Sequence, residues 1–286
     1  MRVFIETYGC AFNQADSDAI AQALRKAGHS IAKNEAAAQA VVLNTCGVKN
    51  ATENRILHRL RQLAENGRKT IATGCLAQAT PERVLAVNPR ASIVGTFSQD
   101  KLAEAVAEER RVKLLDKTGF PEQHAAVEGV TARIQTARGC LGTCSFCQTK
   151  LARGGLQSIP PKTVLRLCEQ AVANGARELL LTAQDTGCYG LDLQTNLAEL
   201  VGEVTGIPGR FRVRVGMANP EHVLKTMPAL LDAVESEKVY KFLHVPLQSG
   251  SDRVLKAMRR GHSAKDFRRA VSLFRKRFPD ALIATD

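Results

Sequence analysis

Short apolar segments alternate with amphipathic segments along the first third of the chain. Each apolar segment is rich in β-forming residues, and each amphipathic segment repeats its apolar positions at helical spacing. We expect strands at 3–7, 41–45, 70–73 and 92–95, and helices at 16–26, 52–64 and 81–87. Alternation of this kind predicts a parallel sheet with helices on both faces, so the expected fold class is α/β.

The same alternation returns after a stretch, 109–130, that mixes charged residues with turn formers. We expect further strands at 134–137, 178–182, 211–215, 240–245 and 282–284, and helices at 162–173, 196–204, 220–234, 251–258 and 264–277. Repeated βα units without a dinucleotide-type glycine fingerprint predict a full or partial barrel. The expected domains are therefore 1–108 and 131–286, joined by a linker at 109–130.

A tight group of cysteines, Cys140, Cys144 and Cys147, follows the strand expected at 134–137. Three thiolates in one short loop can bind three irons of a [4Fe–4S] cluster and leave the fourth iron without a protein ligand. An open coordination site is typical of a catalytic metal centre. A structural zinc site is the alternative. It needs a fourth ligand, and the sequence has no Cys or His between Cys147 and Cys168.

Three more cysteines, Cys10, Cys46 and Cys75, each stand just past the end of an expected strand in the first domain. Open parallel sheets bind ligands outside the carboxyl ends of their strands. Thiols delivered there by three strands can converge on one further cluster. The alternative is that they are small buried residues, because free cysteine is often fully buried.

Polar residues also stand at the strand ends of the second domain, where barrel enzymes place their functional loops. The candidates for ligand contacts are Gln184, Asp185, Asn219, His244 and Gln248. Each has an ordinary alternative, with Asp185 as a turn residue, Asn219 as a helix cap and His244 as a core histidine. Their joint placement at successive strand ends favours a ligand site.

The formal net charge of +12 indicates a polyanionic partner, and nucleic acid is the commonest one. Basic residues of the last two expected helices either contact phosphates or form a solvated face: Arg259, Arg260, Arg268, Arg269, Arg275, Lys276 and Arg277. No segment reaches the roughly 18 apolar residues of a membrane span, and the first residues have no signal-peptide pattern. We therefore expect a cytoplasmic protein without membrane association, in which clustered cysteines indicate metal or redox chemistry.

Several of these segments resemble one enzyme family. The cysteine loop, with the aromatic Phe146 before its last cysteine, resembles the CxxxCxxC loop of radical S-adenosylmethionine (SAM) enzymes. Thr7-Tyr8-Gly9-Cys10, Asn44-Thr45-Cys46 and Gly74-Cys75-Leu76-Ala77-Gln78 resemble the N-terminal domain of the radical-SAM methylthiotransferases. Gln184-Asp185-Thr186-Gly187, Gly216-Met217-Ala218-Asn219-Pro220 and 242–251 resemble the archaeal and eukaryotic branch, which modifies N6-threonylcarbamoyladenosine in tRNA.

The resemblance implies two [4Fe–4S] clusters and SAM as cofactors. It implies that Cys140, Cys144 and Cys147 hold the catalytic cluster, and that Cys10, Cys46 and Cys75 hold an auxiliary cluster that supplies sulfur. Residues that the resemblance and the strand-end positions assign to cofactor binding are Phe146, Gln184, Asp185, Asn219, His244 and Gln248. The implied reaction places a methylthio group on C2 of N6-threonylcarbamoyladenosine at position 37 of tRNA, by way of a 5′-deoxyadenosyl radical.

The implied partners are the tRNA anticodon loop, whose base would be splayed out, and an electron donor of the flavodoxin or ferredoxin type. The family continues past Thr285-Asp286 with a further barrel segment and an RNA-binding β-domain. The second domain is therefore expected to be an incomplete radical-SAM partial TIM barrel, truncated at its C-terminus.

Three alternatives remain open. A related branch methylthiolates an aspartate of a ribosomal protein, the substrate could be another modified adenosine, or the chain could be a non-enzymatic metal-binding RNA module. Formation of 5′-deoxyadenosine separates the enzymes from the binding module. Of the remaining cysteines, Cys168 is expected in the core because it lies on an apolar helical stripe, and Cys188 has no assigned role.

Overall fold

The computed structural model describes residues 1–119 and 121–286, and the chain divides into two compact units. Unit 1 comprises Met1–His124 and Gln148–Gly154, and unit 2 comprises Ala125–Cys147 and Gly155–Asp286. The chain therefore leaves unit 2 for one short segment and then returns to it. The expected boundaries differ from this division, because 148–154 packs with unit 1 although it lies inside the domain expected at 131–286.

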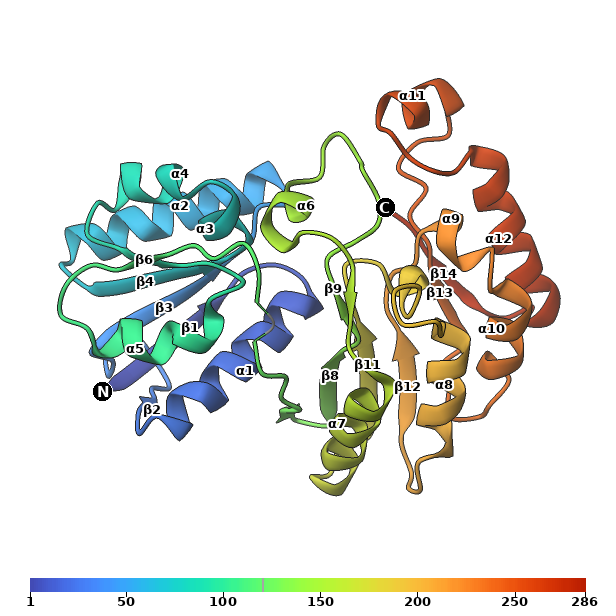
Figure 1. Ribbon diagram of the computed structural model, residues 1–286, viewed down its shortest axis with the longest axis horizontal. Coiled ribbons are helices and arrows are strands. Elements are labelled where there is room, and N and C mark those ends of the chain that lie inside the picture. Colours follow the sequence, from blue (N-terminus) through green and yellow to red (C-terminus); the bar gives the residue numbers. More distant parts are fainter. Residues whose placement is uncertain (120) are drawn as a thin grey trace. The chain divides into compact units, whose positions relative to one another are not determined.

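Unit 1 is built on a parallel sheet with the strand order β2-β1-β3-β4-β5-β6 (Figure 1). Its strands are β1 (Arg2–Thr7), β2 (Ser30–Ile31), β3 (Ala40–Thr45), β4 (Lys69–Gly74), β5 (Ser92–Val94) and β6 (Lys113–Leu114). Its helices are α1 (Ala11–Lys26), α2 (Asn50–Glu65), α3 (Cys75–Ala79), α4 (Pro81–Val87), α5 (Leu102–Ala107) and α6 (Gln148–Arg153), with a 3-10 turn at Gln99–Lys101.

Helices cover both faces of this sheet because successive residues of a strand point to opposite sides. On one face, Val42 and Ile71 pack with Leu24 of α1. On the other face, Leu43 and Ala72 pack with residues of α2, α3 and α4. Figure 1 shows the same division, with α1 and α5 on one side and α2, α3 and α4 on the other. The expected parallel sheet with two helical layers is confirmed.

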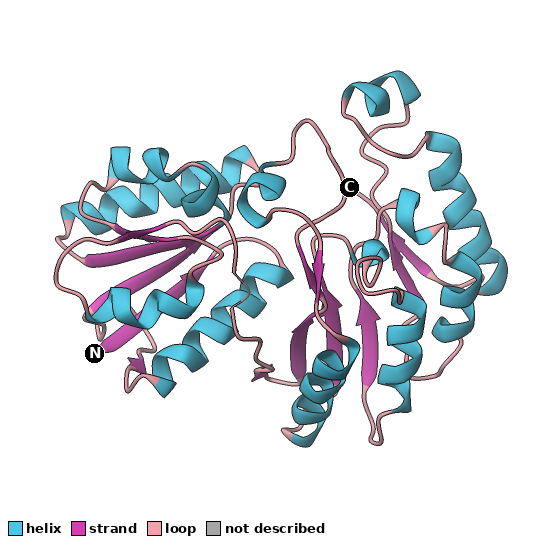
Figure 2. Ribbon diagram, viewed as in Figure 1, coloured by secondary structure: helices cyan, strands magenta, loops and turns pink. Residues whose placement is uncertain are grey.

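Unit 2 alternates strands with helices (Figure 2). Its strands are β7 (Val127–Glu128), β8 (Thr131–Gln135), β9 (Ala137–Arg138), β10 (Gln157–Ser158), β11 (Glu178–Thr182), β12 (Arg212–Val215), β13 (Phe242–His244) and β14 (Leu282–Ala284). Its helices are α7 (Pro161–Ala173), α8 (Leu197–Gly206), α9 (Pro220–Val223), α10 (Met227–Val234), α11 (Asp252–Ala257) and α12 (Ala264–Arg277), with a 3-10 turn η2 at Thr186–Cys188.

The main strands of unit 2 run parallel in an order expected for part of a barrel. β8, β11 and β12 are neighbours, β13 pairs with β14, and a parallel bridge between Val213 and Val239 connects the two groups. One apolar core joins them to the helices, with Leu179 and Val213 from strands, Val164 from α7 and Phe274 from α12. The carboxyl ends of β8, β11, β12, β13 and β14 therefore lead into one set of loops.

The helix expected at 220–234 is interrupted and forms α9 and α10 instead. Pro228 stands in the first turn of α10, where its missing N–H costs nothing, whereas inside a continuous helix it would lose the hydrogen bond to the Leu224 carbonyl oxygen and its ring would clash with that group. The expectation for Cys168 is confirmed, because it is fully buried in the core of unit 2. Within residues 1–119 and 121–286, no helix has both the length and the apolar character that crossing a bilayer requires.

A substitution of Gly74, at the end of β4, can show how tightly the strand ends are packed. Gly74 has a φ of +88°, and a Cβ there would overlap the backbone oxygen of Thr45. Gly28 has a similar φ of +81°, yet no described atom lies within 4 Å of its would-be Cβ. Gly28→Ala should therefore cost only the left-handed strain, about 1 kcal/mol. Gly74→Ala should cost about 2 kcal/mol more, because the backbone must shift.

Denaturant unfolding of the two alanine variants and the wild type measures this difference in the free energy of unfolding. Equal destabilisation of Gly74→Ala and Gly28→Ala would show that the end of β4 is not close-packed.

Candidate functional site

The register of the unit 1 sheet places two cysteines side by side. Thr45 at the end of β3 is paired with Gly74 at the end of β4, so Cys46 and Cys75 are the next residues of adjacent strands. β1 lies on the other side of β3, with Thr7 paired to Asn44, and it leads into Cys10 at the start of α1. Gly9 approaches Cys46 so closely that a Cβ on it would lie 2.9 Å from the Cys46 sulfur. The structure thus brings together the three cysteines of the first domain.

Asn13, a buried residue of α1, ties these strand ends to one another. Its Nδ2 donates to the carbonyl oxygens of Tyr8 and Thr45, at 2.9 Å in both cases. Its Oδ1 lies 3.8 Å from the Cys75 sulfur. Asn44 strengthens the link, because its Nδ2 donates to the Asn13 carbonyl oxygen at 2.7 Å and to the Ser17 hydroxyl at 2.8 Å. The polar residues near the cysteines therefore fix the backbone that carries the thiols.

Two of the three thiols of unit 1 lie in a protected environment. Cys46 and Cys75 are buried, whereas Cys10 is exposed. Burial raises the pKa of Cys46, and the nearby Cys75 and Cys10 thiols raise it further. Burial also raises the pKa of Cys75, but the positive charge of the Arg153 guanidinium opposes that rise. Burial therefore favours the neutral form of the Cys46 and Cys75 thiols.

The cysteine loop of unit 2, 139–147, is anchored at both of its ends. The Gly139 N–H donates to Oε1 of Gln184, at 2.7 Å, which joins the loop to the end of β11. Further along, the Ser145 N–H donates to the Met258 carbonyl oxygen, at 3.0 Å, and its hydroxyl donates to the Ala257 carbonyl oxygen, at 3.2 Å. These bonds fix the loop on the C-terminal end of α11.

Inside this loop, the Cys140 and Cys144 thiols lie beside Gly142. Its N–H donates to the Cys140 sulfur at 3.2 Å, and a Cβ on it would lie 3.4 Å from the Cys140 sulfur and 3.7 Å from that of Cys144. Arg260 contributes a charged donor, with Nη1 at 3.4 Å from the Cys144 sulfur. All three loop cysteines are partly exposed. The loop therefore presents accessible thiols with hydrogen-bond donors already directed at two of them.

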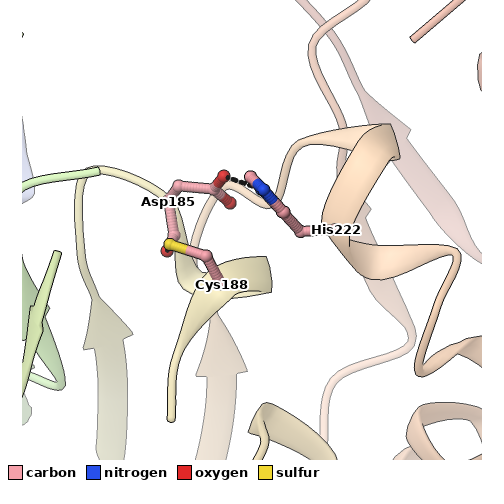
Figure 3. Close-up of side chains that lie close together, drawn as sticks. All are labelled: Asp185, Cys188 and His222. Carbon is pink, nitrogen blue, oxygen red and sulfur yellow. Dashed lines mark hydrogen bonds and ion pairs between the residues drawn. The ribbon is translucent and has the colours of Figure 1, made fainter. Parts of the chain in front are cut away.

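Behind the loop, the carboxylate of Asp185 is fully buried and saturated with hydrogen bonds. Its Oδ1 accepts the N–H groups of Gly187 and Asn219, both at 3.0 Å. Its Oδ2 accepts Nδ2 of Asn219 and contacts Nδ1 of His222, both at 2.7 Å (Figure 3). Burial disfavours the charged carboxylate and so raises the pKa of Asp185. The hydrogen bonds outweigh this effect and hold that pKa below its usual value. Likewise, burial opposes protonation of His222, but pairing with Asp185 raises its pKa.

Figure 3 also shows Cys188 next to this pair, so Asp185, Cys188 and His222 are close enough to suggest a metal site. The hydrogen bonds argue against that role. Both carboxylate oxygens already accept two protein donors each, and a metal would have to displace His222 from Oδ2. The group is better described as an ion pair that joins the ends of β11 and β12.

Cys188 is instead a partner of the cysteine loop. A hydrogen bond between the two thiols is the main cause that lowers the pKa of Cys140 to about 7, against the effect of burial. The same hydrogen bond, together with burial, raises the pKa of Cys188. The Cys188 thiol itself donates to the Asp185 carbonyl oxygen, at 3.1 Å. With its lowered pKa, Cys140 is prepared to act as a thiolate.

The other candidates for cofactor contact lie in different surroundings. Asn219 is buried, and its Oδ1 accepts a bond from Arg260, so it links the Asp185 carboxylate to the residue that contacts Cys144. His244 has Nε2 at 3.4 Å from a carboxylate oxygen of Asp286, and the Gln248 N–H donates to the Asp286 carbonyl oxygen at 3.0 Å. Phe146 is 51% exposed. Asp185 and Asn219 therefore organise the loops, whereas Phe146 is free to contact a ligand.

A cavity of about 600 Å³ in unit 2 adjoins the cysteine loop. Loop residues 141–143 line it, together with residues that follow α11 and begin α12. Its charged lining is mixed and includes Glu221, Lys256 and Arg260. The volume suits a ligand of cofactor size. The candidate residues at the strand ends do not line it: Gln184, Asp185, Asn219, His244 and Gln248.

Four residues near the cysteines escaped the sequence analysis as site residues: Asn13, Arg153, Cys188 and His222. The sequence could have indicated His222, because it stands three positions after the candidate Asn219 at the start of a helix and so lies on the same helical face. Arg153 had none, since α6 is only a short helix without apolar periodicity. Arg260 was grouped with the possible phosphate contacts, but its guanidinium contacts Cys144 and Asn219.

Comparisons with known proteins agree with this arrangement. Residues 2–95 match the family described as Uncharacterized protein family UPF0004, and residues 134–285 match the Radical SAM superfamily. A protein of Pyrococcus horikoshii named probable threonylcarbamoyladenosine tRNA methylthiotransferase is 42% identical over the whole chain, which covers 69% of that protein. The human threonylcarbamoyladenosine tRNA methylthiotransferase is 33% identical, and the chain covers 51% of it.

Solved structures show the same fold at much lower identity. The radical SAM methyltransferase TsrM from Kitasatospora setae has a TM-score of 0.65 and 14% identity, over 99% of this chain and 67% of that protein. The radical SAM enzyme OxsB, described with cobalamin and SAM bound, has a TM-score of 0.63 at 12% identity. The expected α/β fold with a radical-SAM domain is confirmed.

The ion pair of Asp185 and His222 predicts a specific pH dependence of stability. The pKa of His222 is raised above 6.5. The stability that His222 contributes to the folded protein is therefore fully present below pH 6.5 and is lost as pH rises through the raised pKa. The pKa of Asp185 is lowered below 3.8, so its contribution is lost only as pH falls through the lowered pKa. His222→Asn should therefore lower the free energy of unfolding by about 2 kcal/mol near pH 5 to 6, and by less at higher pH.

Denaturant unfolding from acid to alkaline pH measures this difference. His262→Asn is a matched control, because burial and the charge of Arg260 lower the pKa of His262. Relative to His262→Asn, the wild type should become more stable as pH rises. This pH dependence is opposite to the one expected for His222→Asn. A pH-independent effect of His222→Asn would mean that the imidazole is not paired as a cation.

Proposed function

Because the chain belongs to the threonylcarbamoyladenosine tRNA methylthiotransferase family of the radical SAM superfamily, we propose that it transfers a methylthio group to C2 of N6-threonylcarbamoyladenosine at position 37 of tRNA. The observation that supports this most strongly is the presence of two cysteine groups, each at strand ends and each with its own electrostatic environment. Two separate metal centres suit a reaction that needs both a radical source and a sulfur source.

The cysteines of unit 1 fit an auxiliary [4Fe–4S] cluster. Soft thiolate donors select iron–sulfur clusters or zinc, and Cys10, Cys46 and Cys75 are delivered by three neighbouring strands. The nearest charged group is Arg153, a cation that cannot act as a ligand. When bound there, the cluster would supply sulfur. The chain contributes a fixed backbone through Asn13, and burial that excludes water from Cys46 and Cys75.

The loop cysteines of unit 2 fit the second [4Fe–4S] cluster. Cys140, Cys144 and Cys147 would hold it and leave a coordination position open for SAM. When bound, it would supply the electron that splits SAM. Gln184 fixes the start of the loop, Arg260 donates to Cys144, and Cys188 lies beside Cys140. In this proposal Asp185 and Asn219 position the loops, while Phe146, Gln184, His244 and Gln248 lie toward SAM.

The domain roles follow from these assignments. We assign the auxiliary cluster to unit 1, which contains the expected domain 1–108, and radical chemistry to unit 2, which contains most of 131–286. A cytoplasmic location and an electron donor of the flavodoxin or ferredoxin type complete the proposal, because the second cluster must be reduced before each turnover.

The tRNA partner is proposed to bind through α12. This helix presents Arg268, Arg269, Arg275 and Lys276 to solvent, while Ala270 and Phe274 face the core. Exposed basic side chains along one helix match the spacing of backbone phosphates better than a scattered surface charge does. The anticodon loop is the proposed contact, because a single-stranded loop can expose the modified adenine for reaction.

Cys46→Ala separates the roles of the two cysteine groups. The variant should still convert SAM to 5′-deoxyadenosine, since Cys140, Cys144 and Cys147 are intact, but it should form no methylthio product on tRNA. Liquid chromatography with mass spectrometry measures both products after anaerobic reconstitution. Cys168→Ala, in the core of unit 2, is the cysteine control and should retain both. Normal methylthio product from Cys46→Ala would remove Cys46 from the sulfur site.

Arg268→Gln combined with Arg269→Gln tests the proposed tRNA surface. Loss of two phosphate contacts should weaken tRNA binding about tenfold at moderate salt and reduce the slope of log affinity against log salt by about 2. Filter binding across a salt series measures both quantities. Lys162→Gln with Arg166→Gln removes the same charge from exposed positions of α7 and is the control. Equal weakening by both pairs would indicate general charge attraction instead of a surface on α12.

A further inference from the structure

The segment that follows the cysteine loop supplies unit 1 with a buried cation. α6 packs in unit 1, where the Thr96 hydroxyl donates to the Ala152 carbonyl oxygen at 2.5 Å. The next residue is Arg153, whose side chain is completely buried. Arginine is almost never fully buried unless it is paired. Its retention in the core of a small domain therefore calls for a specific reason.

One nitrogen of the Arg153 guanidinium is well paired. Nη2 donates to Oδ2 of Asp16 at 2.5 Å and to Oδ1 of Asn13 at 3.1 Å. The plane of the group lies over the Phe12 ring, with Cζ at 4.9 Å from the ring centre. Asp16 and Asn13 therefore fix both the position and the orientation of the cation.

The other two nitrogens of the guanidinium are not paired in this way. Nε and Nη1 of Arg153 are buried and have no hydrogen-bond partner in the part of the chain that the structure describes. A buried donor left in this state is destabilising, because it has lost its bonds to water without gaining others. Cys75 lies beside this group, because Oδ1 of Asn13, which accepts Nη2 of Arg153 at 3.1 Å, is 3.8 Å from the Cys75 sulfur. The cation is thus oriented by Asp16 and Asn13, with spare donors beside a cysteine proposed to bind a cluster.

On this basis we propose that Arg153 is a positioning residue for the auxiliary cluster, and that its buried charge and spare hydrogen-bond donors raise the reduction potential of that cluster. The inference depends on the proposed function, because it requires a cluster on Cys10, Cys46 and Cys75. Three thiolates make the site anionic, and one-electron reduction adds further negative charge. A fixed cation in a low-dielectric core stabilises the reduced form more than the oxidised form.

The test isolates the auxiliary cluster in the full chain. Cys140, Cys144 and Cys147 are all changed to Ala, and the protein is reconstituted with iron and sulfide. The potential is then measured by redox titration followed by electron paramagnetic resonance. Arg153→Gln in this background should shift the oxidised-to-reduced ratio about tenfold toward the oxidised form, equivalent to about 59 mV for a one-electron couple. Arg153→Lys should restore most of the shift, because it keeps the charge.

Two further variants separate the charge of Arg153 from a general effect on unit 1. Arg90→Gln removes the same charge from an exposed position of unit 1 and should leave the potential unchanged, because water screens it. Asp16→Asn removes the anion that neutralises Arg153 and should raise the potential. This last variant also tests the inference if Arg153→Gln fails to fold or to retain iron.

The outcomes distinguish the inference from the function on which it rests. About four irons per chain in the triple cysteine background are expected for one cluster. No bound iron there would overturn the auxiliary cluster itself. A retained cluster whose potential is the same with Gln at position 153, or one that does not rise with Asp16→Asn, would overturn the role of Arg153 and leave the proposed function standing.

Discussion

Both cysteine groups depend on a buried polar side chain that fixes the loops behind them. In unit 1, Asn13 donates to the carbonyl oxygens of Tyr8 and Thr45 and so holds the ends of β1 and β3 together. In unit 2, Asp185 accepts bonds from Gly187, Asn219 and His222 and so joins the ends of β11 and β12. Loops are the least constrained part of an α/β fold. A site that needs several sulfurs in fixed positions must therefore restrain them with hydrogen bonds that exclude water.

The two groups nevertheless differ in how their thiols are stabilised. In unit 1, burial dominates and raises the pKa of Cys46 and Cys75, and one buried guanidinium opposes it at Cys75. In unit 2, the interaction of Cys140 with Cys188 lowers the pKa of Cys140, and the loop remains partly exposed. A protected site suits a group that must be retained through the reaction. A more open loop suits a centre that must receive a small-molecule cofactor and an electron.

Much of this arrangement could be predicted from the sequence, because parallel strands have a strong apolar pattern and bring their carboxyl ends to one edge. That rule alone placed Cys10, Cys46 and Cys75 together, and the register of β3 and β4 agrees. The rule identifies which residues stand at the edge but not where their side chains point. Asp185 stands at the end of β11 as expected, yet its hydrogen bonds go to protein groups that only the folded structure brings near.

The division into units shows a second limit of reasoning along the chain. Residues 148–154 lie inside the stretch that matches the Radical SAM superfamily, and still they pack in unit 1. A fragment ending at 124 would lose Arg153 and leave Asp16 buried without that cation. An unpaired buried carboxylate is costly enough to unfold a marginal domain. Unit 1 therefore cannot be completed until the chain beyond the Cys140 loop has been made, so the folding of the proposed sulfur site is linked in sequence to the loop proposed for radical chemistry.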